Sequence, residues 1–153
     1  MNKTLDSIQI VGISVKTTNE EGQAMQDIGA LWGRFKGQDI HTAIPNKVNG
    51  HIYCIYTNYE GDHTQPYDVV LGCEVNAIPN IPEGLVSHTI QANSYKVYTA
   101  KGDLTTGQAV GQKWSEIWEA NLNRNFKSDF ELYSEDTKDP TDGVVEIYIG
   151  VET

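Results

Sequence analysis

The sequence of 153 residues predicts a single α+β domain built from two β-α-β-β repeats. Segments in which apolar residues alternate with polar ones indicate strands, and two segments with apolar residues at helical spacing indicate amphipathic helices. These segments follow one another in the same order in each half of the chain. We therefore expect a mostly antiparallel sheet, two main helices on one face of it, and a ligand cleft between the repeats.

The first repeat is expected at about residues 1–76. An alternating segment at 8–15 leads into a helical run that Gly37 should end, and strand-like segments follow at 52–56 and 68–75. The apolar stripe of this helix comprises Met25, Ile28, Leu31, Trp32 and Phe35.

The second repeat is expected at about residues 88–153, after a crossover at about 77–87. Pro79, Pro82 and Gly84 break both periodicities in that crossover. Residues 88–100 are predicted to be extended and are followed by a second helical run and two strands. The apolar stripe of this second helical run comprises Val110, Trp114, Ile117, Trp118 and Leu122.

The two helical runs open with the same tripeptide. Gly-Gln-Ala stands at 22–24 and again at 107–109, about 85 residues later. Each half alone has too few elements to bury a core. We therefore expect a duplicated unit within one domain rather than two domains.

The composition narrows the classes of partner. A formal net charge of -10 repels nucleic-acid phosphates and anionic membranes, so cationic or neutral partners are favoured. The sequence shows no leader and no apolar stretch of membrane-spanning length, which predicts a cytoplasmic protein. Cys54 and Cys73 are expected to be free thiols, although a disulfide between them is sterically conceivable.

Metal and cofactor sites are not expected. His51, Cys54 and Cys73 lack a fourth ligand, and no phosphate-binding glycine loop or nucleophile elbow occurs. The acidic series Asp136, Asp139 and Asp142 does not match a calcium loop. Pro140 and Gly143 predict a hairpin turn there instead.

Both C-terminal strands carry a glutamate beside a tyrosine. By strand alternation Glu131 shares a face with Tyr133, and Glu146 shares a face with Tyr148. A buried carboxylate costs several kcal/mol unless a cation or hydrogen-bond donors replace its hydration. Either glutamate could instead be solvated on an outer face. If one of them is buried, a pocket that accepts a cation is one solution.

Aromatic side chains are candidates for the walls of such a pocket. Trp114 and Trp118 lie on a helical stripe, where tryptophan is more often part of a core. A cation-π contact is nevertheless worth about 0.5–2 kcal/mol, and we expect Trp114 to line the cleft. Tyr53 and Tyr56 fall on opposite faces of their strand, so at most one of them can do the same.

Three segments resemble a known family. Leu31–Phe35, Phe130–Tyr133 and Val145–Val151 are similar to the gyrase-inhibitor-like small-molecule-binding domain, which is also the effector-binding domain of AraC- and MerR-type regulators. The resemblance implies a duplicated fold with a ligand cleft, in which Glu131 corresponds to the buried glutamate that faces lipophilic cations. It also places Tyr148 at the site. Residues 1–153 leave no room for a helix-turn-helix, so a stand-alone binding domain without direct DNA contact is expected.

The predicted function is therefore non-catalytic binding of lipophilic cationic small molecules. Two alternatives remain open: a hydrolase that uses Glu131 as a base, and a protein-interaction module that acts on a topoisomerase. The predicted ligand-binding residues are Glu131, Tyr148, Trp114, Glu146, Tyr56, Tyr53, Trp118 and Tyr133.

Overall fold

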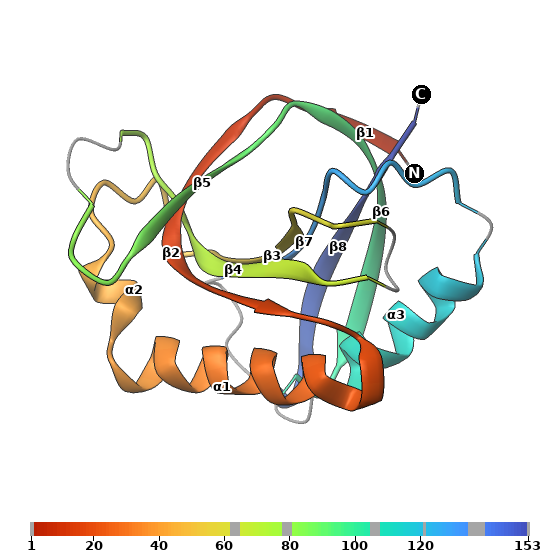
Figure 1. The fold of residues 1–153 in the computed structure, drawn as a ribbon, viewed down its shortest axis with the longest axis horizontal. Coiled ribbons are helices and arrows are strands. Elements are labelled where there is room, and N and C mark those ends of the chain that lie inside the picture. The colour runs from red at the N-terminus through yellow and green to blue at the C-terminus, as the bar shows by residue number, and fades with distance from the viewer. Residues whose placement is uncertain are drawn as a thin grey trace.

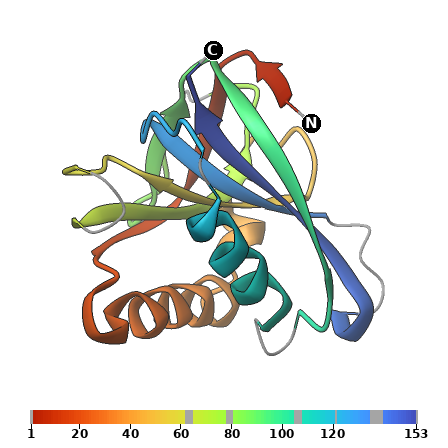
Figure 2. The ribbon, with the colours of Figure 1, turned by 90° about the vertical axis from the view of Figure 1, so that its right-hand side faces the viewer.

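Eight antiparallel strands form one sheet in the order β1-β6-β8-β7-β3-β4-β2-β5. The computed structural model describes residues 2–61, 65–77, 81–104, 108–120, 122–134 and 140–152. The sheet curls, with α1 running below it and α3 beside β6 and β8 (Figure 1, Figure 2). The strands are β1 (Asn2–Leu5), β2 (Ile8–Thr17), β3 (Ile52–Thr57), β4 (Tyr67–Glu74), β5 (Val86–Ile90), β6 (Asn93–Gly102), β7 (Ser128–Tyr133) and β8 (Gly143–Val151).

Within the described ranges, three α-helices and two single-turn helices accompany the sheet. The helices are α1 (Gln23–Gly37), the short α2 (Ile40–Ala43) and α3 (Gln108–Glu119), with 3-10 turns at Glu20–Gly22 and Pro140–Asp142. The prediction that the first helix ends at Gly37 is confirmed. Among the described residues, every helix is too short or too polar to cross a bilayer.

The structure differs from the expected elements at three places. The strand β1 and the helix α2 were not predicted, and the extended segment at 88–100 is two strands, β5 and β6. The chain turns at residues 91–92 because β5 pairs with β2 at one edge of the sheet, whereas β6 pairs with β1 and β8. Pro79, Gly107, Asp136 and Asp139 lie outside the described residues.

Two glycines allow β2 and β4 to approach each other closely. Gly12 pairs with Gly72 in the register of these strands. A Cβ atom at Gly12 would meet the carbonyl oxygen of Leu71, and one at Gly72 would meet that of Val11. No side chain can move aside to relieve such a contact, because both neighbours are backbone atoms.

The apolar core has three parts. Leu31 and Phe35 of α1 pack with side chains such as Cys54 of β3 and Leu71 of β4, and Ile117 of α3 packs with Val145, Ile147 and Ile149 of β8. The third part consists of side chains on the opposite face of the same strands. Its buried members are Ile10, Tyr53, Ile55, Val70, Ile90, Tyr95, Phe130 and Tyr148.

The strand register connects the α1 core to the α3 core. Cys54 is paired with Glu131, and Glu131 is paired with Ile147. Because paired residues point to the same face, Glu131 lies in the row between the residues that α1 covers and those that α3 covers. Cys54 and Cys73 are both buried, and neither is in a disulfide, as predicted.

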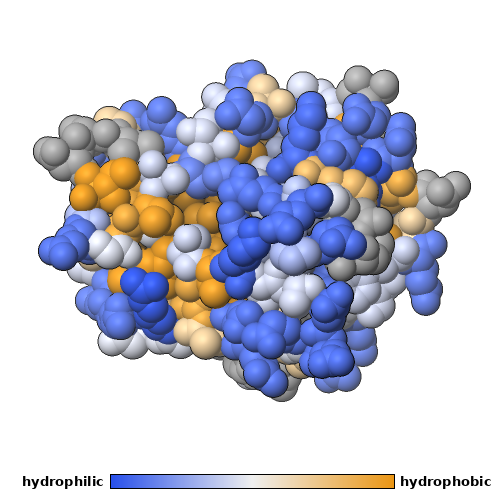
Figure 3. All heavy atoms as spheres, in the orientation of Figure 1, coloured by the Kyte–Doolittle hydropathy of each residue, from blue (hydrophilic) through white to orange (hydrophobic). Residues whose placement is uncertain are grey.

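In the view of Figure 3, most of the surface is hydrophilic. Apolar residues gather on this face toward the side where α2 and β5 lie. The hydrophilic remainder agrees with the acidic composition of the chain.

Candidate functional site

The carboxylate of Glu131 is buried at the centre of the sheet. The residue is 3% exposed and accepts hydrogen bonds from three aromatic side chains. The Tyr56 hydroxyl lies 2.8 Å and the Trp114 Nε1 atom 2.6 Å from Oε2, while the Tyr133 hydroxyl lies 2.5 Å from Oε1. These donors belong to β3, α3 and β7, so one carboxylate joins three elements.

The donors around Glu131 only partly offset the cost of burying it. Burial raises the pKa of Glu131 above its ordinary value of 4.5, although the hydrogen bonds from Tyr133, Trp114 and Tyr56 act in the opposite direction. Burial, together with the nearby carboxylate, raises the pKa of both tyrosines well above 10. Tyr56 and Tyr133 therefore remain neutral donors, and none of these three contacts supplies a positive charge.

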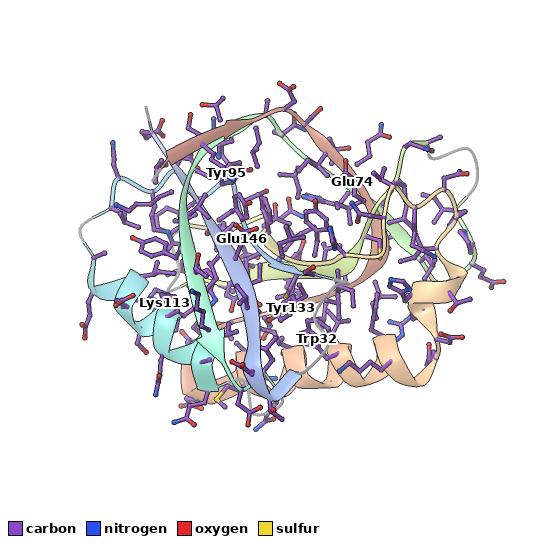
Figure 4. The ribbon with its side chains drawn as sticks, turned by 180° about the vertical axis from the view of Figure 1, so that it is seen from behind. Trp32, Glu74, Tyr95, Lys113, Tyr133 and Glu146 are labelled. Atoms are coloured by element: carbon purple, nitrogen blue, oxygen red, sulfur yellow. The ribbon has the colours of Figure 1, made fainter. Side chains whose placement is uncertain are left out.

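Aromatic rings continue from this carboxylate toward both long helices. The Trp114 ring lies 5.3 Å from the Tyr56 ring at an interplanar angle of 75°. On the other side, Trp32 of α1 lies 4.9 Å from Tyr133, and Figure 4 shows the two together above α1. Ring faces carry negative electrostatic potential, so this arrangement suits a cation with an apolar body.

A second buried carboxylate lies two residues earlier on β7. Asp129 is 0% exposed and contacts Arg124, whose Nη2 atom lies 2.6 Å from Oδ2. The Tyr59 hydroxyl and the backbone N–H of Gly150 also donate to it, at 2.5 Å and 2.8 Å. Asp129 is therefore neutralised within the chain, whereas the three groups that donate to Glu131 are neutral.

Sequence reasoning missed Asp129, Arg124 and Tyr59. The available signal was strand alternation, because Asp129 shares a face with Glu131 and Tyr133. The partner Arg124 could not be read from that pattern, since it precedes β7 and lies outside any predicted element.

The structure brings four of the eight predicted residues together. Tyr56, Trp114 and Tyr133 contact Glu131 directly, which answers which of the two β3 tyrosines lies beside it. Trp118, a fifth predicted residue, lies one turn further along α3 and is 49% exposed. Its ring lies 6.3 Å from that of Trp114.

The other three predicted residues, Tyr53, Glu146 and Tyr148, lie on the opposite face of the sheet. Since Glu131 pairs with Ile147, the neighbours Glu146 and Tyr148 must point away from it. The Tyr148 ring instead stacks on Phe130 at 4.6 Å, and the Tyr53 hydroxyl donates to Glu74 at 3.3 Å. The sheet therefore separates these three residues from Glu131.

A curled antiparallel sheet that holds a buried carboxylate among aromatic rings is typical of a domain that binds small molecules. The chain belongs to the family of integron-associated effector binding proteins, whose model matches residues 3–151. This confirms the effector-binding domain that the sequence resembles.

Individual relatives match over nearly the full chain. The integron cassette protein from the mobile metagenome of Vibrio cholerae is 28% identical, with a TM-score of 0.76 over 99% of this chain and 95% of that chain. YobU of Bacillus subtilis (strain 168), named as a candidate transcriptional regulator, is 27% identical over 97% of this chain and 94% of its own length. The structure of SAV2435 bound to tetraphenylphosphonium has the same fold, with 22% identity and a TM-score of 0.80 over 99% of this chain and 93% of that chain.

Proposed function

We propose that this protein binds lipophilic organic cations, without catalysis, at the Glu131 carboxylate. The observation that carries the proposal is the burial of an acidic group whose three hydrogen-bond donors are all neutral. Among the described residues, no cation contacts Glu131 in the way that Arg124 contacts Asp129. A cation that reaches Glu131 would supply the missing charge, and the surrounding rings would contact the apolar part of the ligand.

We infer that the ligand cleft lies between two duplicated units, β2-α1-β3-β4 and β6-α3-β7-β8. Support comes from the strand order, which reads β3-β4-β2 in one direction and β7-β8-β6 in the other from the junction of β3 and β7. Glu131 on β7 and Tyr56 on β3 face each other across this junction. With α1 and α3 covering the same face, a ligand would enter between the helices and reach Glu131 beside Trp114.

The attraction between such a ligand and Glu131 is large enough to select for charge. At a separation of about 5 Å and an effective dielectric constant of about 20, two unit charges attract by about 3 kcal/mol. This corresponds to at most about 150-fold in affinity, before the cost of removing the cation from water is subtracted. A neutral molecule of the same shape would gain only the contacts with the rings.

Tetraphenylphosphonium, the ligand bound by SAV2435, is a suitable first probe. It combines a single positive charge with four apolar rings, which are the two properties that the proposed ligand class requires. The likeness between the two proteins supports the shared fold, and the case for the ligand class comes from the contacts of Glu131.

The test compares a cation with a neutral molecule in wild type and in Glu131→Gln. Calorimetric titration with tetraphenylphosphonium and with triphenylphosphine oxide gives four affinities. The substitution should weaken the cation by about 10- to 100-fold and the neutral oxide by less than about threefold. Equal weakening of both ligands would defeat the role assigned to Glu131.

A separate assay distinguishes binding from hydrolysis. In a hydrolase the Glu131 carboxylate would accept a proton from the water that attacks the substrate, whereas a binding site needs only the ionised carboxylate. Incubation of the protein with activated esters and epoxides should leave them unchanged. Product that forms in wild type and disappears in Glu131→Gln would favour the enzymatic alternative.

A further inference from the structure

The hydrogen bonds to Glu131 take up most of its capacity as an acceptor. A carboxylate offers about four lone-pair sites, two on each oxygen. Oε2 accepts hydrogen bonds from both Tyr56 and Trp114, and Oε1 accepts one from Tyr133. Counting the contacts of the described residues, about one lone-pair site is left for a ligand, on Oε1.

The surroundings of this carboxylate offer few other acceptors. In the strand register Glu131 lies between Cys54 and Ile147, which are both buried and of which only the thiol accepts hydrogen bonds, weakly. The Tyr56 hydroxyl oxygen already accepts from the Cys54 thiol, with 3.7 Å between sulfur and oxygen. Among the described groups that contact Glu131, the Tyr133 hydroxyl oxygen is the other acceptor, so a ligand finds about two.

Organic cations differ in how many acceptors they need. A primary ammonium carries three N–H donors, a tertiary ammonium carries one, and a quaternary ammonium or a phosphonium carries none. Each N–H that leaves water without finding an acceptor weakens binding by about 5- to 150-fold. A primary ammonium at Glu131 would leave at least one donor unpaired, whereas a quaternary cation has no such donor to satisfy.

The aromatic rings around Glu131 can hold a cation that makes no hydrogen bond. Ring faces attract a quaternary ammonium electrostatically and contact its apolar substituents. The Trp114 and Tyr56 rings lie 5.3 Å apart, and the Trp32 and Tyr133 rings, seen together in Figure 4, lie 4.9 Å apart. The charge of Glu131 acts on such a cation at a distance, since Coulomb attraction does not depend on a free lone pair.

We propose that the Glu131 site selects quaternary ammonium and phosphonium cations over primary ammonium ions built on the same apolar group. The donors Tyr56, Trp114 and Tyr133 set this selectivity, because they leave a ligand the charge of the carboxylate but little of its capacity to accept hydrogen bonds. The inference rests on the proposed function, since it requires a cation at Glu131.

The test uses three ligands that share a biphenylmethyl group and differ only at nitrogen. They are the primary, dimethyl and trimethyl ammonium ions, all singly charged at neutral pH. Calorimetric titration of wild type gives their dissociation constants. The trimethyl ion should bind more than about tenfold more tightly than the primary ion, with the dimethyl ion between them. Equal or tighter binding of the primary ion would overturn the proposal.

Removing one donor separates the hydrogen-bond effect from the extra contacts of the methyl groups. Tyr56→Phe keeps the ring and frees a lone-pair site on Oε2, so the advantage of the trimethyl ion over the primary ion should shrink about three- to tenfold. Tyr53→Phe is the matched control on the same strand, because its hydroxyl donates to Glu74 on the opposite face, and it should leave this advantage unchanged. An advantage that is undiminished in Tyr56→Phe would overturn the proposal.

Folding and the proposed function are checked separately. Circular dichroism and thermal melting verify the fold of Tyr56→Phe, and Trp114→Phe, which frees the other occupied site on Oε2, is a second variant with the same expected result. Glu131→Gln is titrated with the same ligands. If it weakens the primary and trimethyl ions but wild type does not prefer the trimethyl ion, only the selectivity is wrong. If it weakens neither, the proposed function fails and the selectivity fails with it.

Discussion

Acidification should weaken cation binding at a pH above the ordinary range of a glutamate. The ligand needs the ionised form of Glu131, whose pKa is raised above 4.5 by burial in the free protein. Affinity should therefore be constant at high pH and fall as the pH drops through this raised pKa. Below it, each pH unit should cost about tenfold in affinity, or about 1.4 kcal/mol, until the pKa of the complex is reached.

The stability of the free protein has the opposite dependence on pH from the affinity for the cation. Because the fold disfavours the ionised carboxylate, the folded chain holds the proton more tightly than the unfolded chain. Glu131 therefore contributes less to stability as the pH rises from 4.5 to its raised pKa. A bound cation removes this penalty, so tetraphenylphosphonium should raise the melting temperature more at neutral pH than at acidic pH.

The pH at which the affinity begins to fall, the midpoint of the profile, can be shifted by removing a hydrogen-bond donor to Glu131. Trp114 Nε1 lies 2.6 Å from Glu131 Oε2, and a hydrogen bond to a charged group is worth about 1.5–3 kcal/mol. Trp114→Phe keeps an aromatic ring but loses this bond, so the midpoint should move up by about one to two pH units.

Titration with tetraphenylphosphonium from about pH 8 to pH 4.5 measures both profiles, with Glu131→Gln as the control that should be nearly flat. A flat wild-type profile over this range would refute the assignment of the cation to Glu131. A midpoint that is unchanged in Trp114→Phe would show that the indole does not stabilise the carboxylate.

Two further predictions concern the scaffold that holds the site. Asp129→Ala leaves Arg124, whose side chain is 9% exposed, without its partner and should lower the free energy of unfolding by about 3–5 kcal/mol in urea denaturation. Gly72→Ala should cost more than about 2 kcal/mol, because its Cβ would meet the backbone of Val11, whereas Gly29→Ala on the exposed side of α1 should stabilise by about 0.5–1 kcal/mol.

Each of these two predictions can fail clearly. A loss below about 1 kcal/mol in Asp129→Ala would mean that the ion pair adds little beyond its desolvation cost. Equal effects of alanine at positions 72 and 29 would contradict the close approach of β2 and β4.

Local patterns predicted most of the secondary structure. The alternation at Phe130–Tyr133 and Val145–Ile149 predicted β7 and β8, and the apolar stripes predicted α1 and α3. The division of 88–100 into β5 and β6 escaped prediction because both halves have strand character, and only their different pairing partners require the turn.

The candidate site was predictable in its chemistry but only partly in its membership. Alternation within β7 placed Tyr133 on the face of Glu131, yet it could not say how β7 is aligned with β8. One residue of register decides whether Glu131 shares its face with Ile147 or with Tyr148. The resemblance pointed to Tyr148, which the structure places on the other face, against Phe130.

The sequence by itself determined the α+β class and the acidity of the chain, since these depend on composition and periodicity, and its short motifs carried the resemblance to an effector-binding domain. Only the tertiary structure decided which groups meet that glutamate. Tyr56 is 75 residues and Trp114 17 residues away from it in the chain, and no local periodicity relates positions at such separations. Strand register and the packing of α3 bring them together, and these follow from burial across the whole sheet.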